Sequence, residues 1–130
     1  MNRPNFLRFA LLADAIASGA TGVLLIAGAS LLDGLLGLPV ALMREAGLLL
    51  MPYVALVTYV GTREVISRPA VRTIIALNIL WTVCSIGLLL TDYVAPTALG
   101  YAFVLAQAAV VAVFAELQFV GLRRQSLLTA

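Results

Sequence analysis

The stretch PTALGYAFVLAQAAVVAVFAELQFVGLRR, residues 96–124, decides the fold class of this protein. Between Pro96 and the arginine pair Arg123 and Arg124, its only charged residue is Glu116. A helix of about 20 apolar residues is long enough to cross the hydrocarbon core of a bilayer. The stretch therefore predicts a transmembrane α-helix over residues 96–124.

Three further apolar runs precede it, and each of the four follows a proline. Proline is favoured at the first position of a helix, where its missing N–H removes no hydrogen bond. The sequence predicts helices at about residues 4–32, 39–61, 69–91 and 96–124. We therefore expect an all-α integral membrane protein, in which residues 1–130 form a single domain, a bundle of four transmembrane helices.

The start of the second helix has two interpretations, because Arg44 and Glu45 interrupt its apolar run. Residues 35–43 are either a separate interfacial segment or part of a continuous helix. We favour the continuous helix, with Arg44 and Glu45 reaching the outer headgroups.

Composition excludes several classes of function. Of all residues, 63% are hydrophobic and 11% are charged, against about a quarter charged in soluble domains. There is no histidine, and Cys84 is the only cysteine, so imidazole ligands, His acid/base chemistry and an intrachain disulfide are excluded. A net charge of +2 does not indicate nucleic-acid binding. The chain lacks a catalytic or phosphate-binding motif, so we expect neither an enzyme nor a bound cofactor or metal.

Arginine placement predicts the orientation, because cytoplasmic segments of membrane proteins carry an excess of basic residues. Seven of the eight arginines fall on one side of the predicted membrane, and only Arg44 falls on the other. We expect a multi-pass protein of the bacterial inner membrane with both termini in the cytoplasm.

Polar side chains interrupt the apolar runs at a common depth. Asp14, Tyr53, Asn78 and Glu116 belong to four different predicted helices. At 1.5 Å per residue, each lies roughly 12–15 Å from the cytoplasmic helix end. Carboxylates at such depth are costly and usually face the protein interior or a water-filled cavity. We expect these four side chains to meet in one layer, with Gln107 nearer the outer leaflet.

Small residues indicate which helices touch. Ser18 and Gly22 continue the i, i+4 stripe that starts at Asp14, while Ala108 and Ala112 precede Glu116 at the same spacing. Small residues at this spacing let membrane helices approach closely. We expect the first and fourth helices to meet along these two stripes.

Pro52 is the one proline inside a predicted helix. It leaves the carbonyl of Leu48 without its helical donor, so we expect a kink there.

The segment Leu12-Ala13-Asp14-Ala15-Ile16 resembles the first-helix segment of the small multidrug resistance transporters, in which a glutamate exchanges protons for drug. Asp14 stands where that family has glutamate. The resemblance covers about ten residues. The family's loop after the first helix and its third-helix pattern are missing, so the chain is not assigned to it. It otherwise resembles many small four-helix bacterial membrane proteins.

Two functions remain open. The first is a proton- or cation-linked transporter or channel, assembled as a homo-oligomer, with the carboxylates on its pathway. The second is a non-transporting accessory or scaffold subunit of a larger membrane complex, in which the polar layer only fixes how the helices pair.

Overall fold

The computed structural model describes the backbone of residues 3–129 and the side chains of residues 6–124. It contains helices α1 (Arg3–Ala27), α2 (Ala29–Leu36), α3 (Val40–Thr62), α4 (Arg68–Leu89) and α5 (Ala98–Thr129). No strand occurs within residues 3–129. Helices α1, α3, α4 and α5 are each long and apolar enough to cross a membrane. The all-helical prediction and the four apolar spans are therefore confirmed.

The first long helix ends at Ala27, five residues earlier than predicted. The N–H of Gly28 donates to the carbonyl of Leu24 at 2.7 Å, and the chain then turns into the separate helix α2. A Cβ atom at residue 28 would lie 2.7 Å from the same carbonyl oxygen. Glycine at residue 28 therefore permits the break. Asp33-Gly34, where the sequence predicted the end of the first helix, lies inside α2.

The favoured interpretation of the next helix agrees with the structure, because α3 runs without interruption from Val40 and Pro39 is its N-cap. Helix α2 ends at Leu36, and its C-cap is Gly37, whose φ of 70° is the left-handed conformation that glycine adopts without strain.

Thr97 explains why α5 begins two residues after Pro96. Its hydroxyl accepts from the N–H of Gly100 at 3.1 Å and donates to the carbonyl of Leu35 at 2.7 Å. The threonine side chain thus caps α5 and binds the end of α2 as well.

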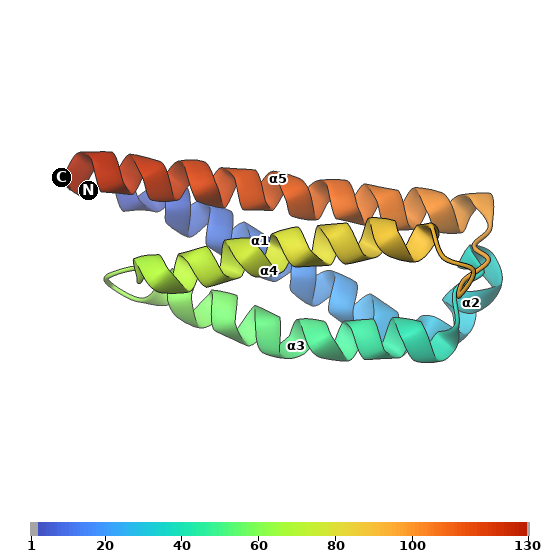
Figure 1. Ribbon diagram of the computed structural model, residues 1–130. Helices are drawn as coiled ribbons and strands as arrows, with labels where there is room; N and C mark the ends of the chain where they lie inside the picture. The colour runs from blue at the N-terminus through green and yellow to red at the C-terminus, as the bar shows by residue number, and fades with distance from the viewer. Residues whose placement is uncertain (1–2, 130) are drawn as a thin grey trace.

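The four long helices run side by side along the length of the molecule, with the start of α1 and the end of α5 together and α2 at the opposite end (Figure 1). Helix α1 packs along both α3 and α5, and α4 packs along α5. The backbones of α3 and α4 scarcely approach each other. The helices therefore leave one weakly closed seam, between α3 and α4.

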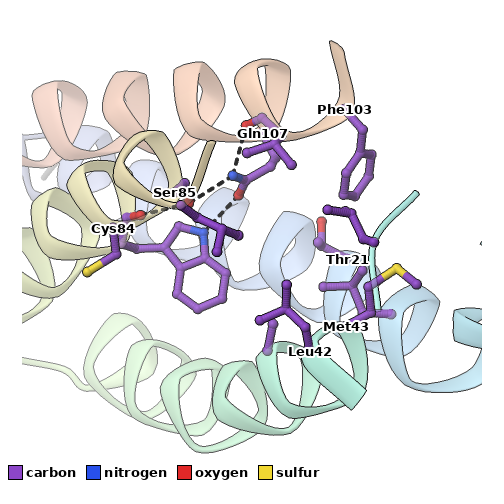
Figure 2. Close-up of a pocket in the computed structure, with 13 residues that line it drawn as sticks. Thr21, Leu42, Met43, Cys84, Ser85, Phe103 and Gln107 are labelled. Carbon is purple, nitrogen blue, oxygen red and sulfur yellow. Dashed lines mark hydrogen bonds between the residues drawn. The ribbon is translucent and has the colours of Figure 1, made fainter. Parts of the chain in front are cut away.

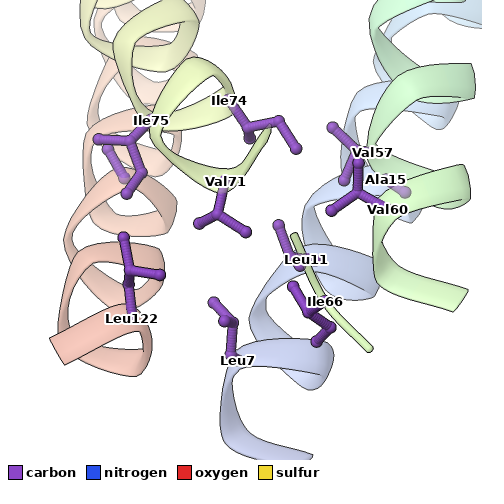
Figure 3. Close-up of a cluster of buried hydrophobic side chains, with 11 residues drawn as sticks. Leu7, Leu11, Ala15, Val57, Val60, Ile66, Val71, Ile74, Ile75 and Leu122 are labelled. Atoms are coloured by element: carbon purple, nitrogen blue, oxygen red, sulfur yellow. The ribbon is translucent and has the colours of Figure 1, made fainter. Parts of the chain in front are cut away.

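Two apolar clusters fill the interior. Figure 3 shows the one near the chain ends, where side chains of the four long helices and of the α3–α4 loop converge, among them Leu7, Val57, Ile66, Ile74 and Leu122. The second includes α2 and lies toward the other end: Leu25, Ala29, Leu36, Leu38, Met43, Leu50, Val94 and Val104. Tyr53 packs against both, which places its ring between them.

Helices α1 and α3 approach closely where two glycines face each other. A Cβ atom at Gly47 would lie 2.7 Å from the carbonyl oxygen of Gly22, and one at Gly22 would lie 3.3 Å from that of Gly47. Backbone atoms cannot move aside as a flexible side chain can. Small residues of this kind let membrane helices pack at short distance.

Gly47→Ala is expected to lower the free energy of unfolding by about 1–3 kcal/mol, the usual range for overpacking. Gly87→Ala in α4 is the matched control, because a Cβ atom there meets nothing within 4 Å, and alanine favours the helix by up to about 1 kcal/mol. Reversible unfolding in detergent, followed by circular dichroism, measures both. Equal effects of the two substitutions would contradict the close approach of α1 and α3.

Candidate functional site

Asp14 is the centre of a buried polar cluster. Its side chain is 1% exposed and lies on the face of α1 that is turned toward the other helices. Ser18, one helical turn later, donates its hydroxyl to Asp14 Oδ1 at 2.9 Å. Each of the other three long helices adds one side chain, so the cluster consists of Asp14, Ser18, Tyr53, Asn78 and Gln118.

The other carboxylate oxygen, Asp14 Oδ2, has three partners. The Tyr53 hydroxyl lies 2.5 Å away, Gln118 Nε2 donates at 2.8 Å, and Asn78 Nδ2 donates at 3.1 Å. The partners also bond to each other, since Asn78 Nδ2 donates to Gln118 Oε1 at 3.0 Å and the Tyr53 hydroxyl lies 2.8 Å from Asn78 Oδ1. One carboxyl group therefore connects α1, α3, α4 and α5.

The local sequence explains why these side chains face inward. On α4, Asn78 continues the buried positions Val71, Ile74 and Ile75 at spacings of three and four residues, which is the period of one helix face. On α3, Tyr53 follows the buried Leu50 by three residues and precedes the buried Val57 by four. Three predicted members of the layer, Asp14, Tyr53 and Asn78, are thus brought together.

Glu116 does not join them, contrary to the prediction. Its side chain is exposed and lies beside a surface pocket between α4 and α5. Gln118, which the sequence analysis missed, takes its place and is 0% exposed.

The signal for Gln118 was present in the sequence. Val104, Ala108, Val111, Ala115, Gln118 and Leu122 recur at alternating spacings of four and three residues. This heptad spacing keeps residues on one face, whereas successive steps of four turn about 40° past a full turn each. The stripe Ala108, Ala112, Glu116 therefore rotates away from the interior.

The expected contact of the first and fourth helices along their small-residue stripes is only partly right. Helices α1 and α5 do pack together, but a Cβ atom at Gly22 would meet Met51, Gly47 and Leu50 of α3. Ser18 and Ala108 are buried, whereas Ala112 lies beside Glu116 at the pocket between α4 and α5. The close approach of α1 and α5 occurs at Gly121 instead, where a Cβ atom would lie 3.0 Å from the Cα of Leu7.

Gln107 belongs to a second polar group, between α4 and α5. Its Oε1 accepts from Trp81 Nε1 at 2.8 Å and its Nε2 donates to Ser85 Oγ at 3.0 Å. Figure 2 shows Gln107 and Ser85 joined in this way at the wall of a pocket. Trp81 lines this pocket and also the two hollows next to the Asp14 cluster.

The Asp14 cluster borders two of these hollows. A cleft of about 600 Å³ is walled by α3 and α4, with Tyr53 and Asn78 among its lining residues. A smaller hollow of about 270 Å³ lies between α1 and α5 and is lined in part by Asp14. The remaining walls are mainly apolar, so space for a small apolar molecule adjoins the cluster on two sides.

Pro52 lines the cleft between α3 and α4 and lies inside the uninterrupted helix α3. Tyr53, the next residue, lines the same cleft, and its hydroxyl contacts Asp14 and Asn78.

Among the residues whose side chains are described, no group of three or more His, Cys, Asp or Glu residues could hold a metal ion. Comparison with protein-family models, curated proteins and solved structures finds no match to this chain.

Proposed function

We propose that this protein is a proton-linked transporter or channel of the bacterial inner membrane, with Asp14 as its proton-binding group. The observation that carries the proposal is a single carboxyl group that receives a partner from each of the other three long helices and borders two hollows. Ionisable groups at membrane depth are rare and often mark proton or substrate pathways.

The walls of the hollows favour a small apolar or amphipathic substrate. Leu49, Leu56, Leu77 and Leu80 line the cleft between α3 and α4, and ligand sites are commonly apolar with a few convergent polar groups. A single four-helix bundle offers little wall for a pathway, so we further propose a homo-oligomer. Light scattering of the purified protein in detergent tests the oligomeric state.

The orientation proposed is that both termini lie in the cytoplasm. The start of α1 and the end of α5 lie together in Figure 1, and seven of the eight arginines belong to segments at that end. An excess of basic residues is typical of cytoplasmic segments. A C-terminal reporter that is active only in the cytoplasm should therefore be active, and an inactive reporter would overturn the orientation.

The alternative, an accessory or scaffold subunit, is favoured by one observation. Both Asp14 oxygens have hydrogen-bond partners, as expected for a group that only fixes helix pairing. Copurification of stoichiometric partner subunits after mild solubilisation would support this role.

Purified protein in liposomes tests transport directly. A pH-sensitive dye inside the vesicles reports proton entry down an imposed pH gradient. The assay is run without a second substrate, and again with ethidium, a hydrophobic cation, inside the vesicles as the exchange partner. We expect entry faster than in protein-free vesicles under at least one condition. Entry at the protein-free rate under both would count against transport.

A further inference from the structure

The Tyr53 hydroxyl lies between two acceptor oxygens. Asp14 Oδ2 is 2.5 Å away and Asn78 Oδ1 is 2.8 Å away. A phenolic hydroxyl has one hydrogen and can donate only once. If Asp14 were ionised, one of these two short contacts would hold no hydrogen at all.

Counting hydrogens over the whole cluster gives the same deficit. Six short polar contacts join the five side chains. The hydroxyls of Ser18 and Tyr53 supply one hydrogen each, the Asn78 amide supplies two, and the Gln118 amide supplies one to Asp14. The arrangement is therefore one hydrogen short.

Turning the amides over does not remove the deficit. If the Asn78 amide is reversed, its oxygen faces two acceptors, Asp14 Oδ2 at 3.1 Å and Gln118 Oε1 at 3.0 Å. If Gln118 is reversed as well, its oxygen lies 2.8 Å from Asp14 Oδ2. The arrangement in which Asn78 Nδ2 faces Asp14 and Gln118 therefore leaves the fewest contacts without a hydrogen, and one added proton completes it.

We propose that Asp14 carries this proton, and that the proton locks α3 to α4. The Asp14 hydroxyl donates to the Tyr53 oxygen, which frees the Tyr53 hydrogen for Asn78 Oδ1. Among the described side chains, Tyr53 to Asn78 is the only side-chain hydrogen bond between α3 and α4. We call this bond the latch.

Loss of the proton opens the latch. When Asp14 releases its proton to water, the Tyr53 hydrogen turns to the carboxylate, and Asn78 Oδ1 is left facing an oxygen without a hydrogen between them. Tyr53 and Asn78 are then joined only through Asp14 Oδ2, to which both donate. The two backbones scarcely touch elsewhere, and both side chains line the cleft between them. Deprotonation should therefore widen the cleft toward the bilayer.

The described hydrogen-bond partners of Asp14 include no cation. On α3 the only titratable group that faces it is Tyr53, while α4 and α5 present the amides of Asn78 and Gln118. On α1, the Arg8 guanidinium donates instead to the carbonyls of Gly61 and Arg63. The other described charged side chains on these helices lie elsewhere: Arg44 and Glu45 at the far end of α3, Arg68 at the start of α4 with its guanidinium donating to the Leu122 carbonyl, Arg72 exposed on α4, and Glu116, Arg123 and Arg124 exposed on α5. No described cation forms a hydrogen bond with Asp14 to offset a negative charge, which is costly at this depth.

Infrared spectroscopy of the protein in lipid membranes tests the proton. We expect the carbonyl band of a protonated carboxylic acid at neutral pH, lost as the pH is raised. The Glu116→Gln variant should keep the band, which assigns it to Asp14, the only other carboxyl group far from the helix ends. Absence of the band from Glu116→Gln at neutral pH would overturn the proposal without requiring any change in the cluster itself.

Electron paramagnetic resonance tests the latch. Cys84 and Leu49 line the cleft from α4 and α3 and both are exposed, so spin labels on Cys84 and on Leu49→Cys measure its width. The distance should increase over the pH range in which the infrared band disappears. Tyr53→Phe should give the long distance at every pH, whereas Tyr59→Phe, which alters an exposed tyrosine of the same helix, should behave as the parent. A distance that does not change while the band is lost would contradict the latch.

The latch deepens the proposed function and rests on it for its physiological use, but neither measurement depends on flux. If both outcomes are as expected and the vesicles show no transport, the proton lock stands and the transport proposal fails. If transport occurs and the infrared band is missing, the transport proposal stands and the proton lock fails.

Discussion

Asp14→Asn is expected to reduce proton entry into reconstituted vesicles to the rate of protein-free vesicles. Asparagine is nearly the same size as the neutral acid and keeps hydrogen-bonding capacity toward the partners of Asp14, but it cannot release a proton. Because Asp14 is the only carboxyl group in the buried cluster, its replacement removes the one carboxyl proton that the cluster could bind and release. The assay is dye-reported proton entry at equal amounts of reconstituted, monodisperse protein.

Glu116→Gln is the matched control for this experiment. It also removes one carboxyl group from a membrane-spanning helix, but Glu116 is exposed and lies outside the cluster. We expect its rate to stay near that of the unsubstituted protein. Full activity of Asp14→Asn would exclude Asp14 as the proton-binding group, and a misfolded Asp14→Asn would favour the accessory role, in which the cluster is structural.

Gln118→Leu is expected to lower the free energy of unfolding by about 1–3 kcal/mol, the range for buried polar groups left without partners. Leucine fills similar space but donates and accepts nothing. Asp14 Oδ2 then loses one of its three donors, and Asn78 Nδ2 loses one of its two acceptors. Measured interhelical hydrogen bonds in membrane proteins are worth about 0.6 kcal/mol on average and up to about 1.7, so two bonds of average strength fall within this range.

The control lies two residues away on the same helix. Glu116→Leu removes an exposed carboxylate from an apolar surface, and we expect it to leave stability unchanged or raise it slightly. Thermal and denaturant unfolding in one detergent compares the two variants. If Glu116→Leu were the more destabilising, the rotation of α5 about its axis would be wrong.

The membrane-spanning segments could be predicted from the sequence because length and apolarity are properties of each segment alone. The same is true of depth, which follows from the rise per residue. Depth and a polar side chain were sufficient to select Asp14, Tyr53 and Asn78, since each helix offers few polar residues at that level.

Rotation about the helix axis was harder to predict. Helix α5 is apolar almost all round, so Glu116 and Gln118 compete for the interior with little amphipathic pattern to decide between them. The charge on Glu116 suggested function, whereas the heptad spacing that places Gln118 inside is a weaker signal. Which side of α1 faces which neighbour also depends on tertiary packing, as the contact of Gly22 with α3 rather than α5 illustrates.

The break at Gly28 was missed for a different reason. An isolated glycine inside a helical pattern is usually tolerated, and Asp33-Gly34 offered the stronger stop signal. The structure divides the segment at Gly28 because α2 turns to meet α5, where Leu36 accepts a bond from the Thr97 N–H at 3.0 Å. That contact joins residues 61 positions apart in the chain and leaves no local pattern.

A double-mutant cycle between Tyr53→Phe on α3 and Gln118→Leu on α5 tests most directly whether one carboxyl group unites the four helices. The backbones of α3 and α5 do not pack together, and the two side chains share Asp14 Oδ2 and Asn78 as partners. We predict a coupling free energy of about 0.5–3 kcal/mol, as for residues in one hydrogen-bond network. The same cycle with Glu116→Leu should give none. Strict additivity of Tyr53→Phe and Gln118→Leu would contradict a shared cluster centred on Asp14.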